Sequence, residues 1–178
     1  PRAPAERFEM CVGAILTQNT AWTNVEQALH RLSELNGLSP DGLDLLSDDD
    51  LRQAIRPAGY FNAKTRKLRE FASHRRAWGD AIPSRDQLLA VWGIGPETAD
   101  SIRLYAYAQL ELVVDAYTSR ILGHLGLAEP KASYDRLKAT CVAALPADLV
   151  TYQEFHALLV EHAKRTYRRS PYRDALFE

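Results

Sequence analysis

Apolar residues recur along this chain with the spacing of helices. Phe8, Val12, Ile15 and Leu16 mark one apolar face, and a second comprises Val25, Ala28, Leu29, Leu32 and Leu35. Intervals of three and four residues are typical of amphipathic helices that turn one side toward a core. The strand-like run from residue 110 to residue 114 is too short and isolated to support a sheet. The pattern therefore predicts an all-α fold of about nine or ten short helices.

Polar residues mark where several of these helices should begin. Ser47 with Asp50, and Ser84 with Gln87, fit the capping-box pattern, in which a hydroxyl and a side chain three residues later satisfy free amide groups. Pro40 suits the first turn of a helix, where its missing N–H costs nothing. These signals place helix starts near residues 40, 47 and 84.

Composition makes the chain an ordinary globular protein rather than a strongly charged one. Hydrophobic residues account for 46%, charged residues for 25%, and the formal net charge is −1. A surface that binds nucleic acid would therefore have to come from local clustering, as in the basic runs 64–76 and 165–173. Either run is equally explained as a solvated helix face. No apolar run reaches membrane length and no signal peptide opens the chain, so we expect a cytoplasmic, nucleoid-associated protein without a membrane partner.

The two cysteines limit metal chemistry. Cys11 and Cys141 lie far apart and form no C-x-x-C pair. They cannot supply a four-cysteine iron–sulfur cluster or zinc site, so we expect two buried free thiols, no cofactor and no bound metal.

The most informative segment spans residues 89–99. An apolar helix runs into Gly93-Ile94-Gly95, and a second helix begins at once with Glu97 and Thr98 near its start. Glycine allows positive φ and leaves the backbone bare, and Ile94 should anchor the turn in the core. The amide groups at the start of the second helix would then face outward, where they can bind a phosphate without reading sequence. Taken alone, Gly-x-Gly is equally a generic tight turn.

Four segments, in order, resemble motifs of one enzyme family. They are residues 13–20, 59–64, 89–99 and 112–120. Together they resemble the helix-hairpin-helix DNA glycosylases of the endonuclease III superfamily, and most of all the cluster-free 3-methyladenine DNA glycosylase III type. The resemblance implies two helical lobes with DNA between them. Residues 8–108 would form a six-helix barrel with the hairpin, and residues 109–178 a second lobe packed with residues 1–7.

Two acids decide the expected chemistry. Asp115 follows two valines and precedes a helical pattern, so it should cap a helix. The family's catalytic aspartate stands at this position, and an ionised carboxylate there would stabilise positive charge on the sugar or orient the attacking water. Glu97 matches the position of the lysine that forms a Schiff base in bifunctional relatives, and a glutamate cannot form that imine. A plain capping aspartate and an exposed first-turn acid are the alternative interpretations.

Further site residues follow from the resemblance. Trp22 would stack on the extruded base, Gln18 would fill the gap that the base leaves, and Tyr60 would wedge into the opposite strand. Lys164 would line the base pocket, although a protonated lysine there would repel a cationic base. The alternatives are a core tryptophan, a polar residue at a helix end, a surface aromatic and a solvated helix lysine. If Lys164 does line the pocket, either it is neutral, or it pairs with an acid such as Glu161, or the substrate is not cationic.

Together these expectations indicate a monofunctional glycosylase that removes an alkylated base such as 3-methyladenine. Its partner would be double-stranded DNA with a damaged base, and it would act as a monomer. Arg165, Arg168 and Arg169 would replace the DNA contacts of the missing cluster loop. Two alternative functions stay open: a glycosylase for a mismatched or oxidised pyrimidine, and a non-catalytic DNA-binding module. Whether the hairpin carbonyls bind a monovalent cation is also open.

Overall fold

The computed structural model describes residues 3–129, 131–167 and 172–177. Helices dominate these residues, and none of them lies in a β-strand, so the all-α prediction is confirmed. Residues 110–114 form an extended connection, in which the side chains of Leu112, Val113 and Val114 are buried. Of the described helices, none is long and apolar enough to cross a membrane.

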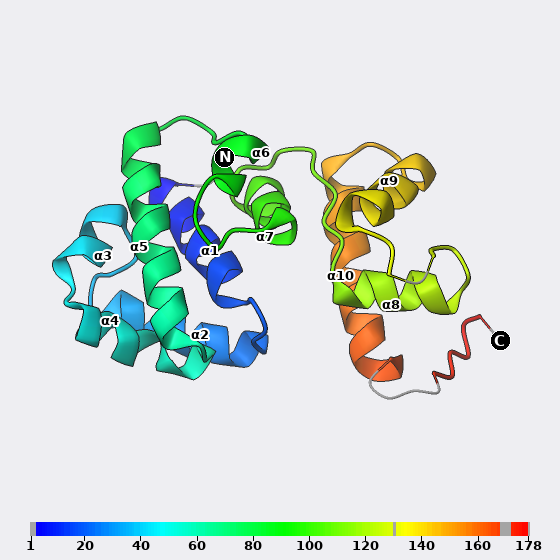
Figure 1. Ribbon diagram of the computed structural model, residues 1–178, viewed down its shortest axis with the longest axis horizontal. Coiled ribbons are helices and arrows are strands. Elements are labelled where there is room, and N and C mark those ends of the chain that lie inside the picture. The colour runs from blue at the N-terminus through cyan, green and yellow to red at the C-terminus, as the bar shows by residue number, and fades with distance from the viewer. Residues whose placement is uncertain (1–2, 130, 168–171, 178) are drawn as a thin grey trace. The chain divides into compact units, whose positions relative to one another are not determined.

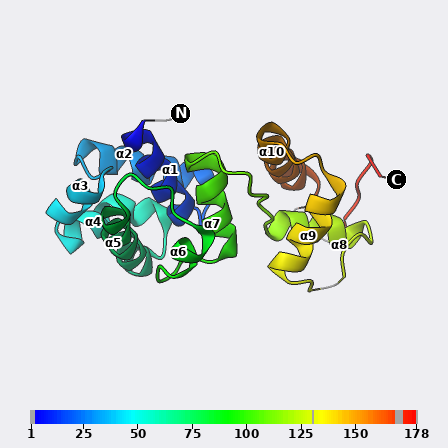
Figure 2. The same ribbon diagram turned by 90° about the horizontal axis from the view of Figure 1, so that it is seen from above.

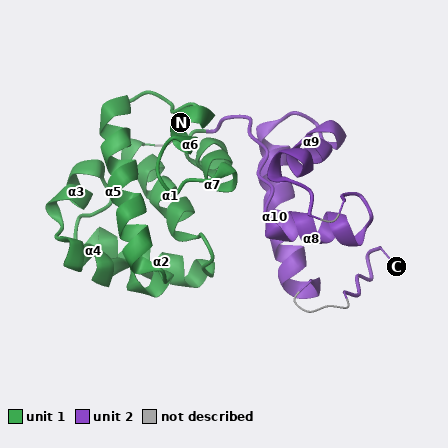
Figure 3. Cartoon of the chain, in the orientation of Figure 1, with its two compact units in different colours: residues 1–107 green, residues 108–178 purple. Residues whose placement is uncertain are grey.

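The chain divides into two compact units, residues 1–107 and 108–178 (Figure 3). Unit 1 contains α1 (Pro4–Leu16), α2 (Trp22–Glu34), α3 (Pro40–Leu45), α4 (Asp48–Ile55), the 3-10 turn η1 (Arg56–Ala58), α5 (Phe61–Trp78), α6 (Arg85–Leu89), α7 (Pro96–Ser101) and the π-helical turn η2 (Ile102–Ala106). Unit 2 contains α8 (Ala116–His124), α9 (Tyr134–Ala144) and α10 (Leu149–Thr166).

The start of the chain belongs to unit 1. Pro4 opens α1, and described residues 3–7 are part of unit 1, while the packing of residues 1–7 against the second lobe stays a prediction. One turn further along the same helix, Phe8 is buried and stacks on Phe71 of α5 with 5.9 Å between ring centroids. A continuous helix carries its first turn with it, so Phe8 fixes the preceding residues as well.

Helix α1 is the centre of unit 1. It packs against α2, α5, α7 and η2, and both views show it among these elements (Figures 1 and 2). Its side chains Cys11, Val12, Ile15 and Leu16 are fully buried. Burial raises the pKa of the Cys11 thiol to about 12 and that of Cys141, in α9, to about 11. Both cysteines are free and buried as predicted, and they stay protonated at neutral pH.

The acidic run 41–50 neutralises one side of α5. Arg69 of α5 donates to Asp48 at 3.1 Å and also to the carbonyl oxygen of Leu46 at 2.6 Å. Arg76, two turns further along, pairs with Asp44 of α3. Much of the basic run 64–76 therefore holds α3 and α4 against α5, and this part of the run is structural.

Unit 2 is built on helices α8 and α10, which cross and pack against each other (Figures 1 and 2). Ile121 of α8 and Ala163 of α10 form its small core with Tyr167. Asp174 is buried, and its Oδ2 lies 2.6 Å from Nε2 of His162 on α10. This contact fastens described residues 172–177 to the end of α10.

The predicted helix starts are confirmed. Ser47 accepts a hydrogen bond from the amide of Asp50 at 3.1 Å, and Ser84 forms a complete capping box with Gln87. Pro40 is the first residue of α3. Each start needs only residues within one turn of itself, so the local sequence determines it.

Candidate functional site

The hairpin between α6 and α7 has the predicted form. Gly93 adopts φ of +83°, in the left-handed region, and Ile94 is buried at 5% exposure. The Ile94 amide donates to the carbonyl oxygen of Val91 at 3.1 Å, while Trp92 and Gly95 on either side are exposed. The turn is therefore anchored from inside by Ile94, as expected, and presents a bare backbone at Gly95.

A buried ion pair fixes the two helices of the hairpin to each other. Asp100 of α7 is fully buried, and its Oδ1 accepts a hydrogen bond from Nε of Arg85 of α6 at 2.8 Å. A buried carboxylate keeps its charge only when a partner compensates for the lost water. The pair therefore sets the angle at which α7 leaves the turn and aims its first amide groups.

Gln18 follows α1 and contacts the hairpin directly. Its Nε2 donates to the carbonyl oxygen of Gly93 at 3.1 Å and to Oγ1 of Thr98 at 2.9 Å, while its Oε1 accepts from Nζ of Lys67. This orientation of the amide satisfies both of its ends. Gln18 therefore bridges α1, α5 and the hairpin within unit 1, which the sequence did not indicate.

Lys67 also explains why residue 93 is a glycine. A Cβ at this position would lie 2.7 Å from two side-chain carbons of Lys67. Burial lowers the pKa of Lys67. Next to it, the guanidinium carbon of Arg66 stands 3.8 Å from the ring centroid of Trp92. Arg66 and Lys67 thus bring two cationic side chains of α5 to the hairpin, and Nε of Arg66 also lies 3.9 Å from Oε1 of Glu70 on the same helix.

Tyr60 lies at the turn that precedes α5. It is 71% exposed and adopts φ of +46°, an uncommon backbone conformation for a large side chain. Behind it, Lys64 is almost completely buried. The ring of Tyr60 therefore projects from a turn that is held from inside the protein.

Trp22 opens α2 and is not a core residue. Its side chain is 49% exposed, and its Nε1 donates to Oε1 of Glu26 at 2.9 Å. The indole lies against Gly13 of α1, where a Cβ would stand in ordinary van der Waals contact with the ring at 3.6 Å. The core interpretation of Trp22 is wrong, and a large part of its aromatic surface faces solvent.

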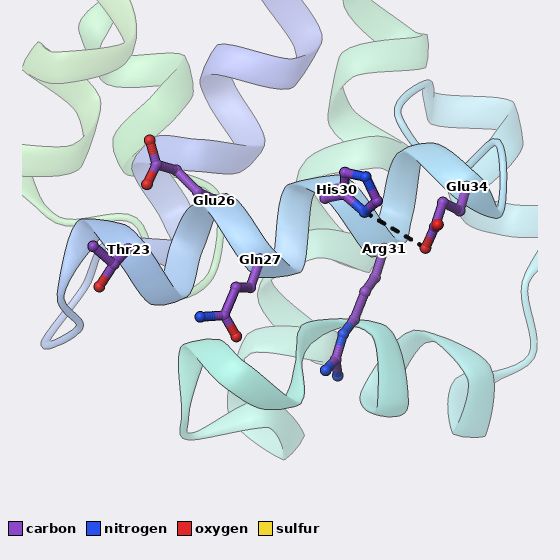
Figure 4. Close-up of a pocket in the computed structure, with 6 residues that line it drawn as sticks. All are labelled: Thr23, Glu26, Gln27, His30, Arg31 and Glu34. Carbon is purple, nitrogen blue, oxygen red and sulfur yellow. Dashed lines mark ion pairs between the residues drawn. The ribbon is translucent and has the colours of Figure 1, made fainter.

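Next to Trp22, a shallow hollow follows the outer side of α2 (Figure 4). Its lining comprises Thr23, Glu26, Gln27, His30, Arg31 and Glu34. Within it, Nδ1 of His30 lies 3.6 Å from Oε2 of Glu34. All lining residues belong to one helix, and their arrangement indicates no catalytic chemistry.

In unit 2, Asp115 is the N-cap of α8, as predicted. Its Oδ1 accepts hydrogen bonds from the amide of Thr118 at 2.7 Å and from Oγ1 of Thr118 at 2.9 Å. The side chain of Asp115 is only 11% exposed, and Thr118 is fully buried. The cap therefore fixes one carboxylate oxygen and leaves Oδ2 in a different direction.

The residue that faces Oδ2 could not be predicted from the sequence. Nε2 of His156, on α10, lies 3.8 Å from Oδ2 of Asp115. Burial lowers the pKa of His156, against the opposing effect of Asp115, so the imidazole is neutral at pH 7. A neutral ring can exchange a hydrogen bond with a molecule at Oδ2 without cancelling the charge of the carboxylate.

The remaining predicted site residues lie at exposed positions. Glu97 is in the first turn of α7, as expected, and Lys164 is on α10. Oε1 of Glu161 accepts from Arg165 at 2.6 Å, and its pairing with Lys164 stays a prediction. Arg168 and Arg169 lie outside the described residues. The assignment of Trp22 in unit 1 and Lys164 in unit 2 to one base pocket stays a prediction.

Comparison with known proteins identifies the fold and the enzyme class. Residues 12–147 match the family model described as HhH-GPD superfamily base excision DNA repair protein. The chain belongs to this superfamily. An HhH-GPD protein of this kind is a DNA glycosylase, and its partner is DNA. The non-catalytic DNA-binding module is thereby disfavoured, and the family resemblance seen in the sequence is confirmed.

Three individual matches agree with the HhH-GPD assignment. A Methanocaldococcus jannaschii protein named "Putative DNA repair glycosylase MJ1434" is 42% identical, over 93% of this chain and 81% of its own length. The Helicobacter pylori 3-methyladenine DNA glycosylase MagIII bound to 1,N6-ethenoadenine is 27% identical with a TM-score of 0.77, over 89% of this chain and 85% of that one. A trapped endonuclease III–DNA covalent intermediate matches with a TM-score of 0.83 and 20% identity, over 92% and 76% of the two chains, and supports the fold alone.

Proposed function

We propose that this glycosylase is monofunctional and removes an alkylated base such as 3-methyladenine from double-stranded DNA, acting as a monomer. The observation that carries the proposal is the cap at Asp115. Thr118 holds Oδ1, and Oδ2 points toward a neutral histidine at 3.8 Å. A carboxylate fixed in this way is preorganised for a cationic sugar, because it need not reorient as the charge develops.

The proposed reaction is hydrolysis of the N-glycosidic bond. As the base leaves, the bond between its nitrogen and the sugar carbon breaks, and the sugar becomes oxocarbenium-like. Oδ2 of Asp115 stabilises this charge and accepts a hydrogen bond from a water molecule, whose oxygen bonds to the sugar carbon. The proton that this water loses passes to Oδ2 and from there to solvent, and a cationic alkylpurine leaves as the neutral base. His156, as a neutral partner beside Oδ2, leaves the charge of the carboxylate uncompensated and helps to orient that water.

Glu97 supports a monofunctional mechanism. Covalent lyase chemistry needs an amine that attacks the sugar carbon and forms an imine. The position where bifunctional relatives carry that amine is an exposed glutamate of α7. We infer that water is the nucleophile and that the product is an abasic site with an intact strand.

The substrate assignment depends on Trp22. Its exposed indole can stack on an extruded purine, and a cationic alkylpurine would gain about 1–2 kcal/mol from a desolvated cation–π contact. Similarity to a glycosylase whose structure contains 1,N6-ethenoadenine supports a purine substrate. The exposed Lys164 favours instead a neutral lesion, such as a mismatched or oxidised pyrimidine, and this is the second candidate.

DNA contacts would come from three parts of unit 1. The amide groups after Gly95 would bind a phosphate, with Arg66 adding charge from its place on Trp92. Gln18, held at the hairpin, would fill the gap left by the base. Tyr60 would enter the opposite strand. Together these residues would offset part of the few kcal/mol that extrusion of a base costs.

A panel of duplexes tests the proposal. Each duplex carries 3-methyladenine, 1,N6-ethenoadenine, a G·T mismatch or an oxidised pyrimidine, and free base and strand cleavage are measured separately. We expect release of the alkylated purines without strand cleavage. Release from the pyrimidine duplexes alone would favour the second candidate, and strand cleavage that follows base release without added alkali would contradict the monofunctional mechanism.

A further inference from the structure

The two segments proposed to enter DNA share an uncommon backbone feature. Gln18 is followed by Asn19 with φ of +54°, and Tyr60 itself has φ of +46°. Neither residue is a glycine, so both conformations are sparsely populated without support from neighbouring structure. A contact from outside each segment must therefore hold it in place.

One side chain contacts both segments. Lys64 is 1% exposed, and its Nζ donates three hydrogen bonds: to the carbonyl oxygen of Leu16 at 2.7 Å, to Oγ1 of Thr20 at 2.6 Å and to the carbonyl oxygen of Ala58 at 2.8 Å. Leu16 and Thr20 bracket the segment that contains Gln18. Ala58 lies two residues before Tyr60. The ammonium group has only three protons, and all of them are used.

Thr20 completes the link between the segments. Its hydroxyl accepts from Lys64 and lies 2.5 Å from the carbonyl oxygen of Ala58, to which it donates. The two segments are therefore joined by the ammonium and by one hydroxyl, over 38 residues of sequence. One turn along α5, Lys67 binds Gln18 itself, so the first turns of α5 hold the segment at two points.

We propose that Lys64 is a positioning residue, which holds the segments of Gln18 and Tyr60 at a fixed spacing so that both enter the duplex together. The inference rests on the proposed DNA-entering roles of these two residues. A merely structural lysine would stabilise the fold and affect every activity equally. A positioning lysine affects extrusion of a nucleotide and leaves contacts to undistorted DNA unchanged.

The test compares binding to two duplexes, one undamaged and one with a tetrahydrofuran abasic analogue. The Kd for the undamaged duplex divided by the Kd for the abasic duplex measures how well the protein accepts an extruded nucleotide. This ratio does not depend on the lesion. For Lys64→Met we expect this ratio to fall about tenfold, equivalent to ~1.4 kcal/mol, with the Kd for the undamaged duplex changed less than about twofold. Lys131→Met removes an equal charge from an exposed position of unit 2 and should leave the ratio unchanged.

A double-mutant cycle separates positioning from general stability. In a Tyr60→Ala background, Lys64→Met should reduce the ratio by clearly less than tenfold, because one of the two residues that it positions has gone and only Gln18 is left. An undiminished tenfold loss in that background would overturn the inference. If Tyr60→Ala alone leaves the ratio unchanged, the proposed role of Tyr60 is wrong, and the positioning role is overturned with it.

Two further measurements keep the test decisive. Thr20→Val keeps the shape of the side chain and both carbonyl acceptors of Lys64, so it tests the link even if Lys64→Met does not fold. It should show the same coupling to Tyr60.

The second measurement is the pH dependence of the ratio. Burial, with a smaller effect of Lys67, lowers the pKa of Lys64 to about 8. A neutral amine has one proton too few for its three acceptors, so the ratio should fall above pH 8 in the wild type. An equal fall in Lys64→Met would assign it to Lys67 and contradict this part of the inference.

Discussion

Replacing Asp115 with asparagine should slow base release about a thousandfold and leave the fold intact. Asparagine is an equally good N-cap, and its Oδ1 can still accept from the amide of Thr118. The substitution therefore removes only the negative charge. A unit positive charge about 4 Å from Oδ2 would gain about 4 kcal/mol at an effective dielectric of ~20, which is about a thousandfold in rate.

The chain provides a matched control for this substitution. Asp148 caps α10 in the same way, with its Oδ1 accepting from the amide of Thr151 at 2.9 Å, but it is exposed. Asp148→Asn should have the same small effect on stability and none on base release. The assay is single-turnover release of free base, with Kd for the lesion duplex measured in parallel. Release by Asp115→Asn at more than about a tenth of the wild-type rate would refute the assignment, since that is a loss of only about 1.4 kcal/mol.

Three further predictions concern other residues of the site. Borohydride should trap no covalent complex with DNA, because Glu97 cannot form an imine; a strong trapped band would indicate another amine. Trp22→Ala should lose about tenfold or more in single-turnover rate on a 3-methyladenine duplex but not on a neutral-lesion duplex. Equal losses on both duplexes would mean that Trp22 stacks on any base and does not select a cationic one. Because burial lowers the pKa of His156, the unfolded state takes up a proton there before the folded state does, so the free energy of unfolding should fall as pH drops through about 6.5. His156→Gln should remove part of this slope in urea titrations, and identical slopes would contradict a neutral buried imidazole.

Local signals in the sequence were sufficient for much of the fold. The caps at Ser47, Ser84 and Asp115 each depend on residues within one helical turn, and all three are present. The anchoring of the hairpin by Ile94 follows from one apolar residue between two glycines. Such features are predictable because the groups that interact are neighbours in sequence.

Contacts between distant segments could not be predicted in this way. His156 is 41 residues from Asp115 in the printed sequence, and nothing in the pattern of α10 pairs them. Likewise, the acceptors of Lys64 lie on α1, on the following loop and on η1. The helical pattern predicts a buried face for α5, but a lysine is ordinarily expected to be exposed to solvent. Its burial can be explained only once the carbonyl groups that surround it are known.

The pairing of the acidic run with α5 has a consequence for how the protein searches a genome. Asp44 and Asp48 pair with Arg76 and Arg69, which leaves Lys67 and Arg66 as the cationic side chains of α5 at the hairpin, and Arg66 itself lies 3.9 Å from Glu70. Affinity for undamaged DNA and its salt dependence both rise with the number of phosphates neutralised. We expect few such contacts from the described residues of unit 1, so its hold on intact DNA should be brief. A long residence would then be confined to the nucleotide that the protein can extrude.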